Sequence, residues 1–252
     1  MKLLLSFIFT VAAGSIAFGQ DPVTIYLAGD STMAEKTADK RPETGWGEKL
    51  QAFFDPLKVR VENRAKNGRS TRSFIEEKSW AAIVDKLKKG DYVFIQFGHN
   101  DQKENTERYA SPADYGKNLV TFVNEVRAKK ALPVLFTPVV RRRFDEQGAF
   151  FDTHGKYPDA VRSVAAELKV PLIDMHRKSE KLLREFGAEG SRKLFLQLKP
   201  DEHPNYPKGI EDNTHFNDYG AEQMASLAVD GIRETKLGLV KYLRKLSTGS
   251  NQ

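Results

Sequence analysis

The chain has 252 residues, of which 40% are hydrophobic and 29% are charged, and its formal net charge is +6. This length and balance are typical of a single α/β domain with a substantial core, and they exclude a chain that is disordered overall. Cysteine is absent, which excludes disulfides, thiolate metal sites, a cysteine nucleophile and a lipidated cysteine.

Residues 1–20 are typical of a secretory signal peptide. Lys2 precedes an apolar stretch, and Ala17 and Gly19 are spaced as at a signal-peptidase site. We therefore expect export to the periplasm or beyond, with residues 21–252 forming one mature domain. An uncleaved anchor is the alternative, but the apolar stretch is short for a membrane span.

Apolar runs of strand length alternate with amphipathic runs along the mature chain. The apolar runs predict strands at residues 23–28, 92–97, 133–138 and 170–174, and residues 58–62 are a further short strand candidate. The other runs predict helices at residues 44–54, from 71 onward, 80–88, from 112 to about 126, 159–168, 175–186, from 218 to about 232, and a basic amphipathic one ending near 246. This alternation predicts right-handed βαβ units and a parallel sheet with helices on its faces.

Ser31 follows the first predicted strand directly, in the turn Gly29–Met33. Ligands bind at the carboxyl edge of open α/β sheets, and a turn of small residues lets a hydroxyl protrude there. A serine nucleophile needs a base within hydrogen-bond reach, and the base needs an orienting acceptor. Asp212 and His215 have the residue types for both roles, and in a helical turn residues three apart have neighbouring side chains. A turn with an Asx cap is the alternative for this pair.

A tetrahedral intermediate also needs preorganised donors for its oxyanion. Three donors follow successive predicted strands: the N–H groups of Ser31 and Gly68 and the side-chain amide of Asn100. Taken singly, Gly68 is equally typical of an Asn-Gly turn and Asn100 of an Asx turn. The order of all these groups along the chain favours one shared site.

Four sequence blocks carry a resemblance to a known family. They are Gly29–Thr32, Gly68 within Asn67–Ser70, Gly98–Asp101 and Asp212–Phe216. Together they resemble the four blocks of the SGNH (GDSL-type) hydrolases, over about residues 23–235. Thr32 after the serine, the stretch 67–74 and Trp46 between two glycines look most like the rhamnogalacturonan acetylesterase branch.

The resemblance implies a three-layer α/β/α, flavodoxin-like domain with five parallel strands. It implies an esterase that needs neither metal nor cofactor and releases acetate from acetylated pectic polysaccharide. Ser31 is then the nucleophile, His215 the base and acid, and Asp212 its orienting group. Ser31, Gly68 and Asn100 are then the oxyanion donors. The chain lacks a G-x-S-x-G elbow, which argues against the α/β-hydrolase fold.

Three further residues are candidates for substrate contact: Arg69, His99 and Arg141. His99 alternatively holds the loop of Asn100. The run Arg141–Arg143 is either a solvated charge cluster or a set of guanidinium groups that meet the carboxylates of an acidic polysaccharide. The scattered positive charge gives no indication of nucleic-acid binding.

The other histidines indicate weaker alternatives. Asp174 and His176 form a rival acid–base pair at the end of the fifth predicted strand. His154 and His203 lie in predicted loops without the spacing of a helical zinc site, which favours a surface role.

The same set of groups leaves several functions open. Acetylxylan and other carbohydrate deacetylases would use the same chemistry, as would lipases or thioesterases. A lipid substrate calls for an apolar rim, whereas the predicted loops are rich in charged residues. A non-catalytic carbohydrate-binding protein is the remaining alternative, and it has no physical need for Ser31, Asp212 and His215 together.

Overall fold

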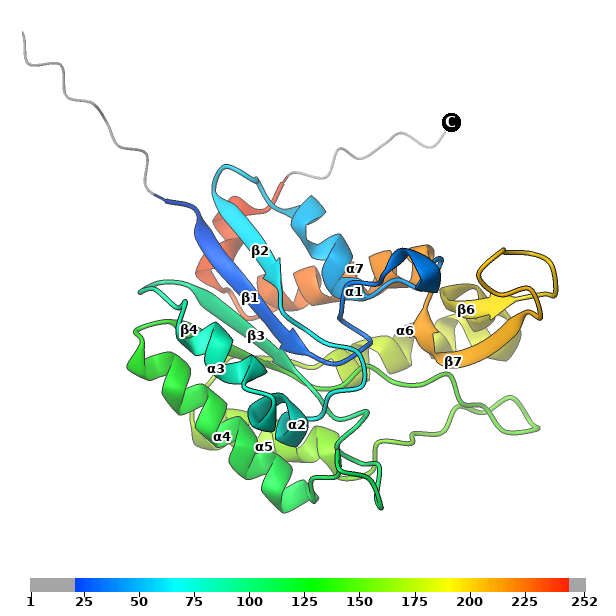
Figure 1. Ribbon diagram of the computed structural model, residues 1–252, viewed down its shortest axis with the longest axis horizontal. Helices are drawn as coiled ribbons and strands as arrows, with labels where there is room; N and C mark the ends of the chain where they lie inside the picture. Colours follow the sequence, from blue (N-terminus) through cyan, green and yellow to red (C-terminus); the bar gives the residue numbers. More distant parts are fainter. Residues whose placement is uncertain (1–20, 245–252) are drawn as a thin grey trace, which may run out of the picture.

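A parallel five-stranded sheet forms the centre of the molecule (Figure 1). The computed structural model describes residues 21–244, so the predicted signal peptide and the last eight residues lie outside the described part. The strands lie in the order β2-β1-β3-β4-β5 and are all parallel. Their bounds are β1 Val23–Gly29, β2 Val59–Asn63, β3 Tyr92–Gln96, β4 Leu132–Phe136 and β5 Leu172–Ile173. This order confirms the predicted flavodoxin-like α/β fold.

Helices cover both faces of the sheet because the central strands are apolar on both sides. Ile25 and Leu27 of β1 face one layer, whereas Tyr26 and Ala28 face the other, as the period of two along a strand requires. The first layer contains α1 Trp46–Lys49, α6 Met175–Gly190 and α7 Asp218–Glu234. The second contains α2 Thr71–Glu76, α3 Ser79–Val84, α4 Pro112–Ala128 and α5 Tyr157–Glu167. Each large apolar side chain buried in these layers stabilises the fold by about 1.5–3 kcal/mol.

Three predicted helices differ from the structure. The helix predicted at 80–88 is α3, which ends at Val84, and the other two are partly or wholly replaced by 3-10 turns. The run predicted at 44–54 forms α1 followed by a 3-10 turn, Leu50–Phe53, and both pieces keep the four-residue spacing of the buried Trp46, Leu50 and Phe54. After α7 the chain forms a 3-10 turn, Gly238–Tyr242, instead of the predicted basic helix. Leu237 and Leu239 are both buried there, and an α-helix does not place residues two apart on one face. None of the helices within residues 21–244 is long and apolar enough to cross a membrane.

A small second sheet lies in the segment that the sequence predicted as a loop. β6, Phe195–Leu198, pairs antiparallel with β7, Ile210–Phe216, and both project beside α6 in Figure 1. The hairpin was not predicted, because the prolines between its two strands are typical of a loop and the polar β7 lacks the apolar pattern of a core strand. This hairpin carries Asp212 and His215.

Candidate active site

Ser31 lies in a tightly held turn at the carboxyl edge of the sheet. Asp30 Oδ1 accepts hydrogen bonds from the N–H and the hydroxyl of Thr32, at 2.9 and 2.8 Å. The chain before α1 packs directly on this turn, and a Cβ on Gly45 would lie only 2.1 Å from the carbonyl oxygen of Ala34. The turn that presents the hydroxyl is therefore fixed on both sides.

A second connection links this turn to the centre of the sheet. The indole N–H of Trp46 donates to Gln96 Oε1 at 3.1 Å, and the Gln96 amide donates to Thr32 Oγ1 at 2.9 Å. All three side chains are buried. The Gly-Trp-Gly signal in the sequence thus has a structural basis, because Trp46 supports the turn of Ser31 from beneath.

His215 connects Ser31 to a carboxylate. Its Nε2 lies 2.8 Å from Ser31 Oγ, and its Nδ1 lies 2.7 Å from Asp212 Oδ2. Burial opposes ionisation of Asp212, but hydrogen bonds from His215 and Thr214 outweigh it and lower the pKa of this carboxyl. An ionised Asp212 accepts a hydrogen bond from Nδ1–H, which leaves Nε2 free to accept the proton of Ser31.

The backbone that brings Asp212 and His215 together differs from the expected helical turn. Both residues lie on β7, and Asp212 Oδ1 accepts the N–H groups of Thr214 and His215 at 2.7 and 2.9 Å. The side chain therefore bends the strand locally into an Asx-type turn. The prediction of the pair holds, whereas the predicted helical geometry was wrong.

The three predicted oxyanion donors lie around one cavity with Ser31. Neither the Ser31 N–H nor the Gly68 N–H donates to another group within residues 21–244. Asn100 uses one amide proton on the carbonyl of Arg69, at 3.0 Å, and keeps the other free. Gly68 has φ +74°, a backbone conformation that favours glycine. Three donors are thus available for an oxygen in this cavity.

His99 lies behind the turn of Ser31 and lines the same cavity. Its Nδ1 is 3.3 Å from Asp30 Oδ2, and both side chains are buried. Burial opposes ionisation of Asp30, but His99 and the two bonds from Thr32 outweigh it and lower its pKa to about 2. Burial lowers the pKa of His99, which favours a neutral imidazole beside the ionised Asp30.

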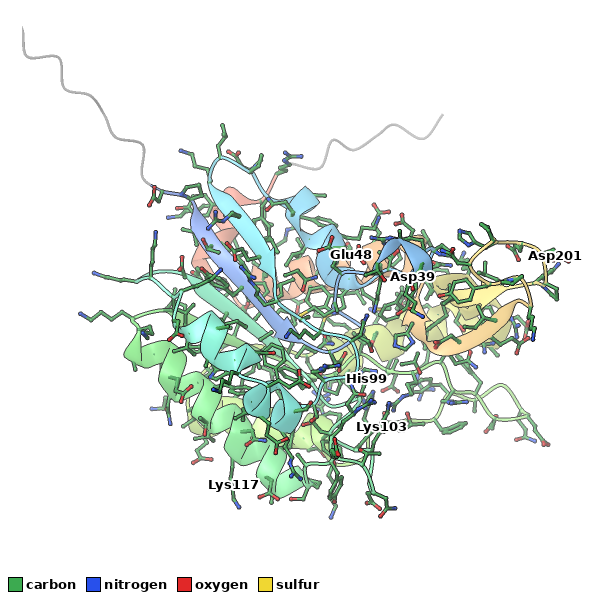
Figure 2. All side chains as sticks on the ribbon, in the orientation of Figure 1. Asp39, Glu48, His99, Lys103, Lys117 and Asp201 are labelled. Atoms are coloured by element: carbon green, nitrogen blue, oxygen red, sulfur yellow. The ribbon has the colours of Figure 1, made fainter. Side chains whose placement is uncertain are left out.

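The cavity has a volume of about 390 Å³ and a positively charged rim. Figure 2 shows His99 and Lys103 at this edge of the sheet, and both line the cavity. Its lining residues are Ser31, Lys40, Glu43, Asn67, Gly68, His99, Asn100, Lys103, Arg108, Arg141, Thr214 and His215. Four of these are cations, and the single acid in the set, Glu43, is paired with Lys36 at 2.8 Å. A substrate in this cavity therefore meets an excess of positive charge.

The arginines that the sequence singled out have different surroundings. Arg141 reaches the cavity but donates to the carbonyl of His99, at 3.2 Å, and to Thr153. Arg142 points away and donates to the side chain of Asn213 at 3.0 Å, so it holds β7. Arg143 is exposed, and the run is therefore not one cluster.

Arg69 lies outside the cavity that contains Ser31. Its guanidinium pairs with Glu77 at 2.9 Å and donates to the carbonyl of Asn67 at 2.9 Å. It lines a neighbouring hollow together with Arg108. Its place in the structure is that of a support for the Gly68 loop.

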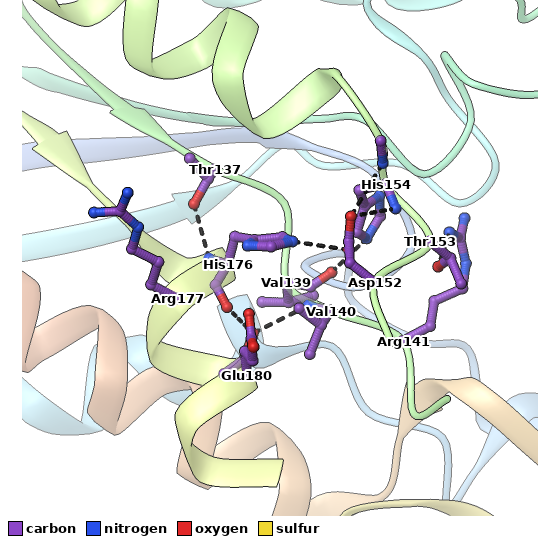
Figure 3. Close-up of polar contacts among 12 residues, drawn as sticks. Thr137, Val139, Val140, Arg141, Asp152, Thr153, His154, His176, Arg177 and Glu180 are labelled. Carbon is purple, nitrogen blue, oxygen red and sulfur yellow. Dashed lines mark hydrogen bonds and ion pairs between the residues drawn. The ribbon is translucent and has the colours of Figure 1, made fainter. Parts of the chain in front are cut away.

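The rival histidines form a separate, buried group, and Figure 3 shows His154 and His176 with Asp152 between them. Asp174 binds Arg162 and Thr137 rather than His176, and His176 Nε2 instead lies 2.8 Å from Asp152. His154 is also buried, and its ring nitrogens lie 2.9 Å from Gln102 Oε1 and 2.8 Å from the Val139 carbonyl. The predicted surface role of His154 was therefore wrong: its loop folds back over the end of β4.

Within residues 21–244, no group of three or more His, Cys, Asp or Glu side chains is arranged to hold a metal ion. His203 lies in the loop between β6 and β7, where its Nδ1 accepts the N–H of Asn205 at 3.2 Å.

The cavity contains residues that the sequence analysis did not single out. Lys103 and Arg108 come from the loop after Asn100, and Lys40 comes from the segment after Ser31. Their nearness in the chain to predicted site residues was an available signal. The buried Lys36 was also missed, because lysine in a loop is normally exposed.

This arrangement can be compared with known proteins. Residues 27–223 match the GDSL-like lipase/acylhydrolase family. The chain belongs to this family. The resemblance to SGNH hydrolases is thereby confirmed, and the matched residues run from within β1 to the first turns of α7.

Several relatives within the family are named as esterases. Rhamnogalacturonan acetylesterase RhgT of Bacillus subtilis (strain 168) is 45% identical over 223 residues, which are 88% of this chain and 94% of that protein. Rhamnogalacturonan acetylesterase of Emericella nidulans is 29% identical over 229 residues, 83% of this chain and 84% of that protein.

Two solved structures have the same fold. The crystal structure of Bacillus subtilis YxiM has a TM-score of 0.74 and 27% identity, and it covers 86% of this chain and 58% of that one. Axe2, an acetylxylan esterase from Geobacillus stearothermophilus, has a TM-score of 0.60 and 20% identity, and covers 85% of this chain and 95% of that one.

Proposed function

We propose that the protein is a serine esterase that releases acetate from an acetylated acidic polysaccharide, specifically rhamnogalacturonan. One observation carries the chemical part of this proposal. Ser31 Oγ, His215 and Asp212 form a continuous chain of contacts at 2.8 and 2.7 Å, and Ser31 and His215 line the cavity together with Gly68 and Asn100. The names of the relatives support the choice of ester and polymer.

The first half of the reaction transfers the acetyl group to the enzyme. Ser31 Oγ attacks the carbonyl carbon of the acetyl ester, and His215 Nε2 takes the hydroxyl proton. The carbonyl oxygen becomes an oxyanion that accepts hydrogen bonds from Ser31 N–H, Gly68 N–H and Asn100 Nδ2. Each such donor is worth about 100- to 1,000-fold in rate. The bond between the carbonyl carbon and the sugar oxygen then breaks, and His215 returns its proton to that oxygen.

The second half regenerates the enzyme with water. His215 takes a proton from a water molecule as its oxygen attacks the acetyl carbon, and the same donors hold the oxyanion. The bond to Ser31 Oγ breaks, the proton on His215 passes to Oγ, and acetic acid leaves and loses its remaining proton to the solvent as acetate. Asp212 stays ionised throughout and holds the imidazole in the required tautomer.

The positive rim supports an acidic polymer as the substrate. No carboxylate within residues 21–244 lies within 4.0 Å of the Lys103 ammonium or the Arg108 guanidinium. Burial lowers the pKa of Lys103, and Arg108 and Arg141 lower it further through repulsion. Such repulsion is relieved when an anion binds, and guanidinium groups suit carboxylates in particular. A neutral acetylated xylan would leave these charges without partners.

A fluorophosphonate probe tests the chemistry, because it reacts with activated serines. We expect the wild-type protein to be labelled and Ser31→Ala to remain unlabelled. Equal labelling of both would remove Ser31 as the nucleophile. A wild type that is not labelled and cleaves no acetate ester would favour the non-catalytic carbohydrate-binding alternative.

Acetate release tests the substrate. We expect faster release from acetylated rhamnogalacturonan than from acetylated xylan or an aryl acetate at equal acetyl concentration. Faster release from xylan would assign the protein to the xylan deacetylases instead. Release from aryl acetates alone would make it a small-ester esterase.

We also propose that the protein is exported, as residues 1–20 indicate. A polymer such as rhamnogalacturonan is encountered outside the cytoplasm, so the proposed substrate is consistent with export. N-terminal sequencing of the mature protein is expected to begin near residue 20 or 21. A mature protein that begins at Met1 would contradict export by this route.

A further inference from the structure

Lys36 is a buried cation beside the proposed nucleophile. Its side chain is 1% exposed, whereas lysine is almost never fully buried without partners. Its ammonium has three: the carbonyl oxygen of Ser31 at 2.5 Å, Asn67 Oδ1 at 2.6 Å and Glu43 Oε1 at 2.8 Å. An ammonium has three N–H donors, so this set uses all of them.

The three partners belong to three separate segments of the site. Ser31 is in the turn after β1, Asn67 is in the loop after β2, and Glu43 is in the segment that leads to α1. Lys36 itself is absent from the cavity lining, so it does not meet the substrate. Its position is that of a connector between the turn of Ser31 and the loop of Gly68.

The contact with Asn67 bears directly on the direction of the Gly68 N–H. The carbonyl oxygen of Asn67 accepts a hydrogen bond from Arg69 at 2.9 Å, while the side chain of Asn67 is held by Lys36. In a trans peptide the C=O and the following N–H point in opposite directions. Holding Asn67 at both its carbonyl and its side chain therefore fixes where the Gly68 N–H points.

We propose that Lys36 is a positioning residue that sets the separation between Ser31 Oγ and the Gly68 N–H. The inference rests on the proposed esterase function. An oxyanion donor displaced by about 1 Å costs about 100-fold in rate, because the hydrogen bond must meet charge that develops only in the transition state. Ground-state binding of the ester does not depend on that bond in the same way, so the turnover and not the KM is affected.

The decisive variant is Lys36→Met, which keeps the length of the side chain and removes the three donors. On an aryl acetate we expect kcat to fall about 100-fold and KM to stay within about twofold of the wild type. The rate of fluorophosphonate labelling is expected to fall with kcat. Lys178→Met is the matched control: Lys178 is also a shielded lysine, 19% exposed and paired with Glu234, but it lies on α6, outside the cavity lining. Its kcat is expected to stay within about twofold.

A second variant keeps the test decisive where Lys36→Met does not fold. Asn67→Ala removes the contact that joins Lys36 to the Gly68 loop and leaves the ammonium paired with Glu43 and with the Ser31 carbonyl oxygen. Asn67 also lines the cavity, so KM for the small aryl acetate is measured alongside kcat. We expect a fall in kcat of about 10- to 100-fold with KM unchanged. Because both changes remove one connection, the double variant is expected to lie within about threefold of the slower single variant.

The outcomes separate this inference from the proposed function. A folded Lys36→Met whose kcat stays within about threefold, with only a lower melting temperature, would show a purely structural role and overturn the inference alone. Asn67→Ala with an unchanged kcat would do the same. A wild type that neither hydrolyses acetate esters nor reacts with the probe would overturn the proposed function and this inference together.

Discussion

Asp212–His215 and Asp152–His176 are two carboxylate–imidazole pairs of nearly equal length, with O to N distances of 2.7 and 2.8 Å. They differ in what the second ring nitrogen reaches. His215 Nε2 meets Ser31 Oγ at 2.8 Å in an open cavity, whereas the Nδ1 of His176 is buried without a hydrogen-bond partner in the described part of the chain. Their backbone settings differ as well, and Figure 3 shows His176 beside Thr137, whose hydroxyl accepts its backbone N–H at 2.8 Å.

An Asp–His pair is not by itself a sign of catalysis. A carboxylate beside an imidazole fixes a tautomer in either setting. A reactive site requires in addition a hydroxyl within reach and donors for the charge that develops. Only the pair on β7 has both, because the hairpin brings it to the carboxyl edge of the sheet where Ser31 lies.

Removal of the imidazole is expected to give the largest difference in kcat between the two pairs. His215→Ala removes the general base, so we expect kcat to fall about 10⁵- to 10⁶-fold, as in other serine hydrolases that lose this group. His176→Ala is expected to change kcat by less than about threefold. Acetate release measured on purified, folded variants checks both. A comparable loss in His176→Ala would place the second pair in the mechanism.

Removal of the carboxylate charge is expected to have the next largest effect. Asp212→Asn turns an acceptor into a group that also donates, which favours the wrong tautomer of His215 and lowers kcat about 10⁴-fold. Asp152→Asn is the matched change in the other pair, and its kcat is expected to stay near that of the wild type. If both asparagine variants lost activity equally, the distinction between the pairs would fail.

Charge at the rim is expected to have a moderate effect that depends on the substrate. Lys103→Met removes one of the cations that meet an acidic polymer, so we expect the ratio of kcat/KM for acidic over neutral acetyl esters to fall about tenfold. The effect is expected to shrink as salt is added, because ions screen exposed charges. An unchanged ratio would contradict the acidic substrate and leave the reaction chemistry intact.

The smallest effect concerns the stability provided by the second pair. Burial opposes ionisation of Asp152, but His176 and the backbone N–H of His154 outweigh it and lower its pKa. Because the pKa of Asp152 is lowered in the folded protein, its ionised carboxylate adds to the free energy of unfolding above the unfolded-state pKa of about 4. This contribution is lost as the pH falls below that pKa. Urea unfolding is therefore expected to show Asp152→Asn less stable than the wild type at pH 7, with the difference shrinking toward pH 3. A difference that grows in acid would reverse the assignment.

The sequence was sufficient for the sheet and for the groups around Ser31. Apolar runs located β1, β3, β4 and β5 because strands buried on both faces are almost continuously apolar. The edge strand β2 was located only as a short candidate, in which Val59 and Val61 alternate with charged residues. The spacing of Asp212 and His215 and their order after Ser31 predicted the contact that the structure shows, although the reasoning assumed a helical turn. The positions of Gly68 and Asn100 at the cavity were predicted in the same way, and their catalytic roles stay predictions.

Other features could not be predicted because they depend on contacts between distant residues. Asp152 lies 24 residues before His176 in an irregular loop, so no local pattern indicates the pair. The hairpin pairs the apolar β6 with the polar β7 and is stabilised by this pairing and by the buried rings of Phe195 and Phe216. The burial of Lys36 depends on three acceptors from separate segments.

The position of the hairpin in the chain determines when, during synthesis, Ser31 acquires its base. Ser31 and His215 are 184 residues apart, and the end of β7 joins the rest of the domain through the Thr44 N–H and the Phe216 carbonyl at 2.9 Å. A nascent chain can build the first four strands of its sheet before it contains β7. The hydroxyl of Ser31 therefore has no base until β7 has been synthesised and His215 has reached it.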